Sequence, residues 1–304
     1  MKQYQTALGR SLPAVAVGCM RIADLTDEQA DRLMMTAIEG GADYFDHADI
    51  YGGGACESRF GAFLHAHPGL RDRIQIQTKC GICKGFYDSS CEHILKSVDD
   101  SLKRLGVEYV DALLIHRPDA LAEPQEIARA FSLLKAAGKV RFFGVSNHNP
   151  MQIEALQEAL DDKLVINQMQ LSVMHTGLID HGINVNTTFK GSEDRDGGTL
   201  EFCKRRHIVL QAWSPFQYDC FEGPFIGNPL FPELNRTLSD IADAYAVTPT
   251  AIAVAWLVRI PAMVQVVTGT TKPERMREIL LGANTPLSRE DWYAIYRAAG
   301  NQLP

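Results

Sequence analysis

The chain has 304 residues, of which 46% are hydrophobic and 22% charged, and its formal net charge is -7 at pH 7. This composition is typical of a globular protein with a large core, and the acidic balance excludes general nucleic-acid binding, which requires a basic surface. No apolar run reaches the roughly 18–20 residues of a membrane span and no signal-peptide pattern opens the chain, so we expect a cytoplasmic protein that binds no membrane.

The first predicted element is a small β-hairpin at residues 3–12, with Gly9 near its turn. Short apolar segments then predict eight β-strands, at residues 15–18, 44–46, 74–79, 110–115, 140–145, 165–168, 208–213 and 263–268. Helical periodicity and capping residues predict helices at residues 26–40, 57–67, 89–106, 124–137, 150–160, 199–206, 238–246, 249–258, 273–281 and 288–299. Thr26 with Gln29, and Ser89 with Glu92, have the spacing of a capping box.

Strands that alternate with helices indicate a parallel sheet joined by helical crossovers. Eight strands favour a closed (β/α)8 TIM barrel of the α/β class, with the hairpin at its N-terminus and an extra helix at its C-terminus. No G-x-G-x-x-G sequence follows a strand, which argues against an open dinucleotide-binding sheet. We expect residues 1–304 to form a single domain, with the long segments 171–198 and 214–237 on the face where barrel enzymes keep their active sites.

Cysteine usage is typical of reduced thiols, because the seven cysteines are an odd number and are scattered along the chain. Cys80 and Cys83 have a metal-like spacing, but Cys91 and His93 fall inside a predicted helix and do not form a second ligand pair. We therefore expect no metal site; a redox-sensitive Cys80–Cys83 pair is the alternative.

Polar residues and glycines stand at the ends of the predicted strands. In chain order they are Gly18-Cys19-Met20, Asp46, Lys79, His116, Ser146-Asn147, Gln168, Trp213 and Thr268. The carboxyl ends of barrel strands converge on one mouth, so these residues are expected to line a common site.

The residues at this mouth suit the protonation of an oxygen that becomes negative during reaction, as in the reduction of a carbonyl. Tyr51 follows Asp46 by five residues. A tyrosine hydroxyl ordinarily titrates near 10, and a nearby ammonium such as that of Lys79 lowers this pKa. Asp46 is expected to hold Lys79 in place, and His116 to hydrogen-bond a substrate oxygen.

Four further residues suit the binding of a nicotinamide, which is both planar and an amide. Trp213 offers a flat face, and Ser146, Asn147 and Gln168 offer hydrogen-bonding groups for the carboxamide.

With these residues in place, the chain resembles the aldo-keto reductase superfamily along nearly its whole length, in particular its bacterial NADPH-dependent branch. Residues 44–54 are similar to the family's Asp-to-Tyr signature, and residues 101–119 to its second signature. Residues 138–147 are similar to the strand that carries nicotinamide contacts.

The resemblance implies a barrel that binds extended NADPH (NADP+), with Tyr51 as proton donor and Asp46, Lys79 and His116 completing the catalytic set. It also implies a set of cofactor contacts, namely Gly18, Met20, Ser146, Asn147, Gln168, Trp213, Ser214, Phe216, Thr268, Gly269, Thr270, Lys272, Arg275 and Glu278.

The resemblance also implies a preference for NADPH, through the segment at residues 268–275. Thr270, Lys272 and Arg275 match in position the residues that grip the adenosine 2′-phosphate, and Glu278 falls where an adenine contact is expected. Ile279 departs from the family, which often has asparagine there.

Two other features depart from many relatives. His47 follows Asp46 directly, where a small hydroxyl residue is usual, and is either a packed histidine or a partner of the catalytic lysine. The segment after Gln168, with His175, His181 and Asn186, is a candidate for shaping the substrate pocket.

The leading hypothesis is an NADP-dependent aldo-keto reductase that acts on a small-molecule aldehyde or ketone as a monomer or weak homo-oligomer. One alternative is a barrel lyase with Lys79 as a Schiff-base nucleophile. Another is a non-catalytic regulatory subunit of the same fold that binds NADPH.

Overall fold

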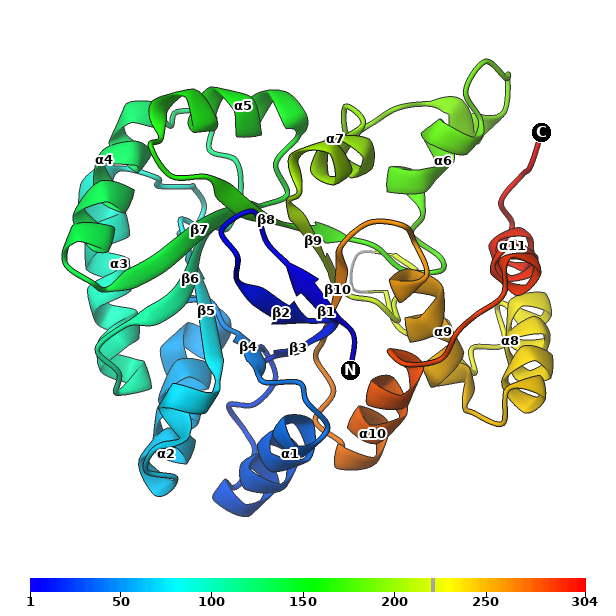
Figure 1. Cartoon of the computed structure of the whole chain (residues 1–304), viewed down its shortest axis with the longest axis horizontal. Coiled ribbons are helices and arrows are strands. Elements are labelled where there is room, and N and C mark those ends of the chain that lie inside the picture. Colours follow the sequence, from blue (N-terminus) through cyan, green and yellow to red (C-terminus); the bar gives the residue numbers. More distant parts are fainter. Residues whose placement is uncertain (220–221) are drawn as a thin grey trace.

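The computed structural model describes residues 1–219 and 222–304. Eight parallel strands close a barrel in the order β10-β3-β4-β5-β6-β7-β8-β9, with helices around it (Figure 1). The strands are β3 (Val15–Gly18), β4 (Tyr44–Asp46), β5 (Gln75–Cys80), β6 (Val110–Ile115), β7 (Val140–Ser146), β8 (Leu164–Gln170), β9 (Val209–Trp213) and β10 (Val264–Thr268). The predicted (β/α)8 barrel is confirmed.

The predicted N-terminal hairpin is also present, formed by β1 (Gln3–Gln5) and β2 (Ser11–Pro13). It lies across one end of the barrel (Figure 1). Tyr4 donates a hydrogen bond of 2.8 Å to the carbonyl of Val264, and the buried Leu12 packs among apolar residues of the strands. The hairpin therefore closes the end at which the strands begin and leaves the opposite end open.

Backbone pairing brings the predicted site residues to that opposite end. Gly18 of β3 is paired with Asp46 of β4, and Ser146 of β7 is paired with Gln168 of β8. Because neighbouring strands share this register, their last residues form one rim.

The helices form the outer layer (Figure 1). They are α1 (Asp27–Glu39), α2 (Ala55–Ala66), α3 (Cys91–Leu105), α4 (Pro124–Ala136), α5 (Pro150–Ala159), α6 (Gly177–Ile183), α7 (Thr199–Arg206), α8 (Pro232–Ala244), α9 (Pro249–Val258), α10 (Pro273–Gly282) and α11 (Arg289–Ala298). In α3, residues Ile94, Val98, Leu102 and Leu105 are buried, a spacing that places one apolar face on the barrel.

The extra C-terminal helix α11 is held to α9 by two stacked tryptophans. The rings of Trp256 and Trp292 lie 4.7 Å apart at 5°, and each indole donates a hydrogen bond to the other residue's carbonyl. Helix α9 is apolar on all sides because it packs between α8, α10 and β10. Within the described ranges no single helix has the length and apolar composition of a membrane span; α8 and α9 meet that criterion only as a pair bent by 90°.

Three predictions of local structure differ most from the observed fold. Helix α8 begins at Pro232 and not at residue 238, since proline suits the first turn of a helix. The segment 171–198, expected without regular structure, contains α6 and a 3-10 turn at Lys190–Ser192. The cap of α3 is Ser90, which accepts a hydrogen bond from the His93 amide, so the Ser89–Glu92 box is wrong. The Thr26–Gln29 capping box is confirmed.

Candidate active site

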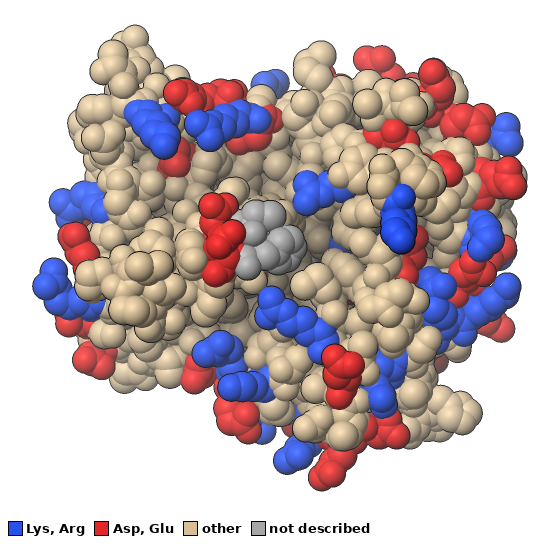
Figure 2. Space-filling model, turned by 180° about the vertical axis from the view of Figure 1, so that it is seen from behind, with Lys and Arg blue, Asp and Glu red and all other residues tan. Residues whose placement is uncertain are grey.

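A cavity of about 850 Å³ opens at the rim where the strands end. Every residue predicted to form the site lines this cavity, except Cys19, Lys79 and Glu278. The predicted residues on its wall are Gly18, Met20, Asp46, Tyr51, His116, Ser146, Asn147, Gln168, Trp213, Ser214, Phe216, Thr268, Gly269, Thr270, Lys272 and Arg275. Figure 2 looks onto this face and shows a hollow beside the grey residues, with Lys and Arg side chains at its border.

Lys79 lies beneath the cavity floor and connects two of the predicted catalytic residues. Its side chain is fully buried, and its Nζ donates hydrogen bonds to Asp46 Oδ1 at 2.7 Å and to the Tyr51 hydroxyl at 3.2 Å. A third bond of 2.7 Å goes to the carbonyl of His47. With three oxygen partners the ammonium is fully satisfied and its position is fixed.

Tyr51 reaches this position through a glycine turn. It begins a 3-10 turn whose next two residues, Gly52 and Gly53, have φ values of 57° and 63°. These left-handed conformations are strained for other residues, which accounts for glycines after the tyrosine. The turn leads directly into α2 and leaves the Tyr51 ring at the cavity wall.

Burial and charge act in opposite directions on the Tyr51 hydroxyl. Burial raises its pKa, the Lys79 ammonium lowers it, and the net pKa lies above the ordinary value. The expectation that Lys79 makes this phenol more acidic than usual is therefore wrong in net direction, because desolvation is the larger effect. Tyr51 holds its proton at neutral pH, as a proton donor must.

His116 is neutral at this site. Burial, followed by the charges of Lys79 and Arg117, lowers the pKa of its imidazole to about 2. Its ring meets that of Tyr51 edge-on, with centroids 5.9 Å apart. The buried Nδ1 has no hydrogen-bond partner among the described residues. A neutral imidazole can donate one hydrogen bond, and a carbonyl oxygen placed beside Tyr51 is a suitable acceptor.

Asp46 is held by two glutamines as well as by Lys79. Its Oδ1 accepts hydrogen bonds from Gln77 Nε2 and, at 3.1 Å, from Gln168 Nε2. Gln168 is the predicted carboxamide contact, and its Nε2 also donates to Gln211 at 2.8 Å. In the described part of the chain no hydrogen bond reaches Gln168 Oε1, so this oxygen is free to accept one at the cavity wall.

A chain of amides continues from Asp46 into the barrel interior. Gln77 and Gln211 exchange hydrogen bonds of 2.9 and 3.1 Å, and Gln211 donates to Gln265 at 2.8 Å. Gln265 in turn donates at 2.7 Å to the carbonyl of Pro13 at the hairpin. These three glutamines were not predicted from the sequence, although a polar residue in the middle of an apolar strand is a signal for a buried network.

Two of the predicted cofactor contacts lie on strained backbone. Asn147 and Ser214 have φ values of 60° and 50°, a left-handed conformation that costs non-glycine residues energy and is frequent at ligand sites. Asn147 donates at 2.8 Å to the Ser146 hydroxyl and accepts at 3.1 Å from the Trp213 indole. These bonds fix the plane of Trp213 at the cavity wall, where a flat ring could stack.

The predicted phosphate contacts lie at the start of α10. Lys272 caps this helix without a side-chain hydrogen bond, and Arg275 is exposed on its first turn. Free amides at a helix N-terminus together with two cations suit a phosphate. Thr268, at the end of β10, has a buried hydroxyl with no partner in the described ranges, and it lines the cavity. Glu278 is half-buried one turn further on and does not line the cavity.

The cavity wall also includes residues that were not predicted from the sequence, among them Arg21, Ile50, Ile82 and Arg117. Arg21 follows the strand-end residues 18–20, and Arg117 follows His116, so each is adjacent to a predicted residue. Only the orientation of the side chains, which the sequence does not show, assigns them to the cavity.

His47 is packed behind the site. Its ring is fully buried, lies 4.7 Å from that of Phe60, and finds no hydrogen-bond partner for either nitrogen among the described residues. Its contact with Lys79 is made by the backbone carbonyl, which any residue could provide. The ring of His47 is therefore a packed side chain and not a partner of Lys79. Burial lowers the pKa of this histidine to about 3.

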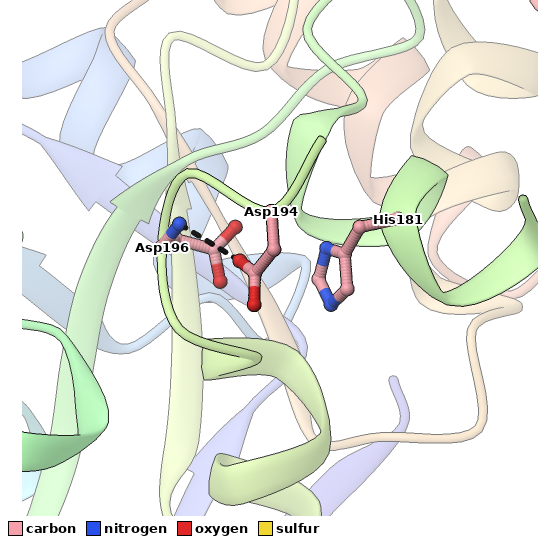
Figure 3. Close-up of side chains that lie close together, drawn as sticks. All are labelled: His181, Asp194 and Asp196. Carbon is pink, nitrogen blue, oxygen red and sulfur yellow. Dashed lines mark hydrogen bonds between the residues drawn. The ribbon is translucent and has the colours of Figure 1, made fainter. Parts of the chain in front are cut away.

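The segment 171–198 does not shape the cavity, in contrast to the expectation for His175, His181 and Asn186, none of which lines it. His181, Asp194 and Asp196 instead gather away from it (Figure 3). Asp194 accepts backbone hydrogen bonds from Asp196, Gly197 and Gly198. Asp196 accepts one of 2.7 Å from Thr199, the first residue of α7. These bonds account for both carboxylates as loop and helix caps.

The six cysteines in the described part of the chain are free thiols. Cys80 is buried, and burial raises its pKa well above the ordinary range. Cys83 is half-buried with its Sγ 3.9 Å from His93 Nε2, and burial raises its pKa as well. Both thiols are protonated at neutral pH, which is typical of ordinary cysteines.

Comparison with known proteins gives a consistent picture. Residues 14–299 match the sequence model of the Aldo/keto reductase family. The chain is 34% identical to the uncharacterized oxidoreductase YcsN of Bacillus subtilis over 325 residues, covering all of both proteins. It is 33% identical to a 6-dehydroglucose reductase of Agrobacterium fabrum, covering 95% of this chain and 94% of that one.

Solved structures agree in fold. The thermostable aldo-keto reductase Tm1743 superposes with a TM-score of 0.79 at 26% identity, covering 98% of this chain and 100% of that one. An aldo-keto reductase of Klebsiella pneumoniae, crystallised with NADPH, superposes with a TM-score of 0.79 at 21% identity, covering 99% and 96%.

Proposed function

The chain belongs to the aldo/keto reductase family, and on this premise we propose that it reduces aldehydes or ketones to alcohols with NADPH, with Tyr51 as the proton donor. The observation that carries the proposal is Lys79 Nζ, which lies within hydrogen-bond distance of both Asp46 and the Tyr51 hydroxyl at the wall of a large cavity.

In the proposed reaction, Tyr51 gives its hydroxyl proton to the carbonyl oxygen of the substrate as that oxygen becomes negative. The Lys79 ammonium then stabilises the phenolate, since opposite charges attract strongly at a buried site. Asp46 keeps Lys79 charged and aimed at Tyr51, and the neutral His116 orients the carbonyl oxygen by a hydrogen bond. When bound, NADPH supplies the hydride that reaches the carbonyl carbon.

The residues present suit this cofactor. Trp213 offers the stacking face for the nicotinamide, and Ser146, Asn147 and Gln168 offer hydrogen bonds to its carboxamide. Lys272 and Arg275, with the amides at the start of α10, would hold the 2′-phosphate. The remaining predicted contacts stay part of the proposal, namely Gly18, Met20, Ser214, Phe216, Thr268, Gly269, Thr270 and Glu278.

Both alternatives have less support. A Schiff-base lyase requires a neutral amine, but Asp46 and Tyr51 outweigh the effect of burial and raise the pKa of Lys79, so the amine is protonated. A non-catalytic binding subunit has no need for the Lys79 contacts, which serve a proton donor. The proposal also includes a cytoplasmic location, which the scattered free thiols support. It further includes a monomer or weak homo-oligomer.

The test is NADPH oxidation against a panel of aldehydes and ketones, with Tyr51→Phe as the matched variant. Loss of a general acid typically costs about 10²–10⁴ in rate, so we expect turnover of Tyr51→Phe to fall by that amount while NADPH affinity stays unchanged. Phenylalanine fills the same space, so folding should be preserved. A variant within tenfold of the parent would remove Tyr51 from the role of proton donor.

A further inference from the structure

Arg117 stands at the corner of the cavity where the proposed chemistry takes place. It follows His116 directly on the loop after β6, is half-buried, and lines the cavity. Its guanidinium carbon lies 6.0 Å from the centroid of the Trp213 ring. His116 in turn meets Tyr51 edge-on at 5.9 Å. Arg117 therefore lies on the side of the proton donor and of the proposed nicotinamide platform.

This arginine has no counter-ion in the part of the chain that the structure describes. Among the described residues it donates no hydrogen bond and pairs with no acid, and its guanidinium lies over the ring of Trp213. Other half-buried arginines are paired, since Arg104 bonds Glu57 at 2.7 Å and Arg71 bonds Asp111 at 2.9 Å. A guanidinium offers five donors, and no hydrogen bond to another described residue occupies those of Arg117.

The charge of the cavity wall also favours an anion. Of the described residues that line it, Asp46 alone is acidic, and its carboxylate is already bound by Lys79. Arg117, Arg21, Lys272 and Arg275 are the basic ones. Under the proposed function Lys272 and Arg275 serve the cofactor phosphate, whereas Arg117 is on the loop after β6, next to His116.

We propose that Arg117 selects carbonyl substrates that carry a carboxylate at a distance from the reacting carbonyl, which its planar fork binds while the carbonyl lies against Tyr51 and His116. This inference rests on the proposed function, because it names the substrate class of the same site. A carboxylate accepts two parallel hydrogen bonds from a guanidinium, which makes the pair both strong and directional.

The test compares acids with matched neutral compounds. The substrates are ortho-, meta- and para-carboxybenzaldehyde and their methyl esters, which keep the aldehyde and remove the charge, together with glyceraldehyde as a neutral hydroxyl-rich probe. The variants are Arg117→Gln, which removes the charge, and Arg117→Lys, which keeps it and removes the fork. Arg129→Gln, an exposed charge on α4, is the control.

For at least one acid we expect kcat/KM to exceed that of its ester by roughly 10- to 100-fold, the range of a charged hydrogen bond. Arg117→Gln should bring this ratio close to one while leaving the esters and the KM for NADPH unchanged. The acid-to-ester ratio of Arg117→Lys should lie between those of the parent and Arg117→Gln. The ratio of Arg129→Gln should equal that of the parent.

Three outcomes would overturn the inference: acids and esters reduced equally well, an acid preference that survives Arg117→Gln, or an equal loss on glyceraldehyde, which would assign Arg117 to hydroxyl recognition. Calorimetric binding of each acid and ester to the protein with NADP+ makes the same comparison without turnover. A protein that binds the acids through Arg117 but reduces no carbonyl would contradict the proposed function alone.

Discussion

At Tyr51, the environment of a single hydroxyl decides how the proposed chemistry works. Burial keeps the phenol protonated, and the Lys79 ammonium 3.2 Å away acts against that effect without overcoming it. The lysine therefore contributes most when the proton has left, because the phenolate then sits beside a buried positive charge. The enzyme would hold a weak acid in the resting state and stabilise its conjugate base during the reaction.

Gln77 acts on the same group from further away. It donates to the Oδ1 oxygen of Asp46 that also binds Lys79, and its own carbonyl accepts from Tyr44 at 2.7 Å. Because both ends of the amide are occupied, Gln77 has one orientation, and Asp46 is fixed with it. We consider Gln77 a positioning residue for the Asp46–Lys79 pair.

Gln77→Leu tests this role. Removing a hydrogen bond to a charged group costs roughly 1.5–3 kcal/mol, so we expect kcat to fall about tenfold or more and the alkaline limb of its pH profile to shift. The KM for NADPH should stay unchanged.

Gln265→Leu is the matched control for Gln77→Leu, since Gln265 is equally buried and contacts Gln211 but not Asp46. Its free energy of unfolding in denaturant should fall by as much as that of Gln77→Leu, while its kcat stays near that of the parent. Equal losses of kcat in both variants would mean that the network supports the fold only.

At the scale of elements, the start of α10 combines a helix N-terminus with two cations. Lys272 and Arg275 flank the first turn of the helix and line the cavity. The aligned amides carry partial positive charge, to which the side chains add full charges. This arrangement favours a cofactor with an extra phosphate over one with a free hydroxyl.

Arg275→Ala should therefore discriminate between cofactors. Because Arg275 is exposed, we expect the KM for NADPH to rise about tenfold, toward the low end for a charged hydrogen bond, while the KM for NADH changes little. Steady-state kinetics with both cofactors measures this. Arg277→Ala, on the same helix but outside the cavity, should leave both values alone. An equal rise for the two cofactors would exclude a 2′-phosphate contact at Arg275.

Some elements were predictable and others were not, for local reasons. Strands such as Val110–Ile115 and helices such as α3 carry strong apolar patterns, and both were predicted. Helix α8 begins within a segment rich in proline, glycine and phenylalanine, a composition typical of loops. Its helical face is recognised only from the structure, in which Leu234 and Leu238 are buried. Helix α6 has only seven residues, too few for a periodic signal.

For the whole molecule, three histidines with lowered pKa values link stability to pH. Burial lowers the pKa of His47 to about 3, that of His116 to about 2 and that of His148 to about 4. In the unfolded chain each titrates near 6.5, so the unfolded state binds more protons as the pH falls. Their contribution to stability is complete above about pH 6.5 and is lost progressively as the pH falls toward each folded value.

We therefore expect the free energy of unfolding to decrease between pH 6 and 4.5 by up to about 4 kcal/mol per pH unit, at about 1.4 for each histidine. Urea unfolding at several pH values measures this slope. His47→Leu should reduce the slope by about a third, because it removes one of the three groups, whereas the exposed His65→Asn should not. An unchanged slope in His47→Leu would show that His47 is not a buried neutral group.

The closure of the barrel suggests that residues 1–304 unfold as one domain. Strand β10, near the end of the chain, pairs with β3 near its beginning, and the hairpin bonds both Val264 and Gln265. We propose a single cooperative thermal transition, with equal midpoints by tryptophan fluorescence and far-UV circular dichroism. Separate midpoints would indicate independently folding parts.

The sequence by itself determined the alternation of strands and helices, the barrel, and the residues at the strand ends, because apolar periodicity, caps and short motifs are local properties. Only the tertiary structure decided the amide chain from Asp46 to Gln265, the net direction of the Tyr51 pKa and the lack of a counter-ion for Arg117 among residues 1–219 and 222–304. Each of these depends on which distant side chains surround a group and exclude water from it, and such distances exist only after the barrel has closed.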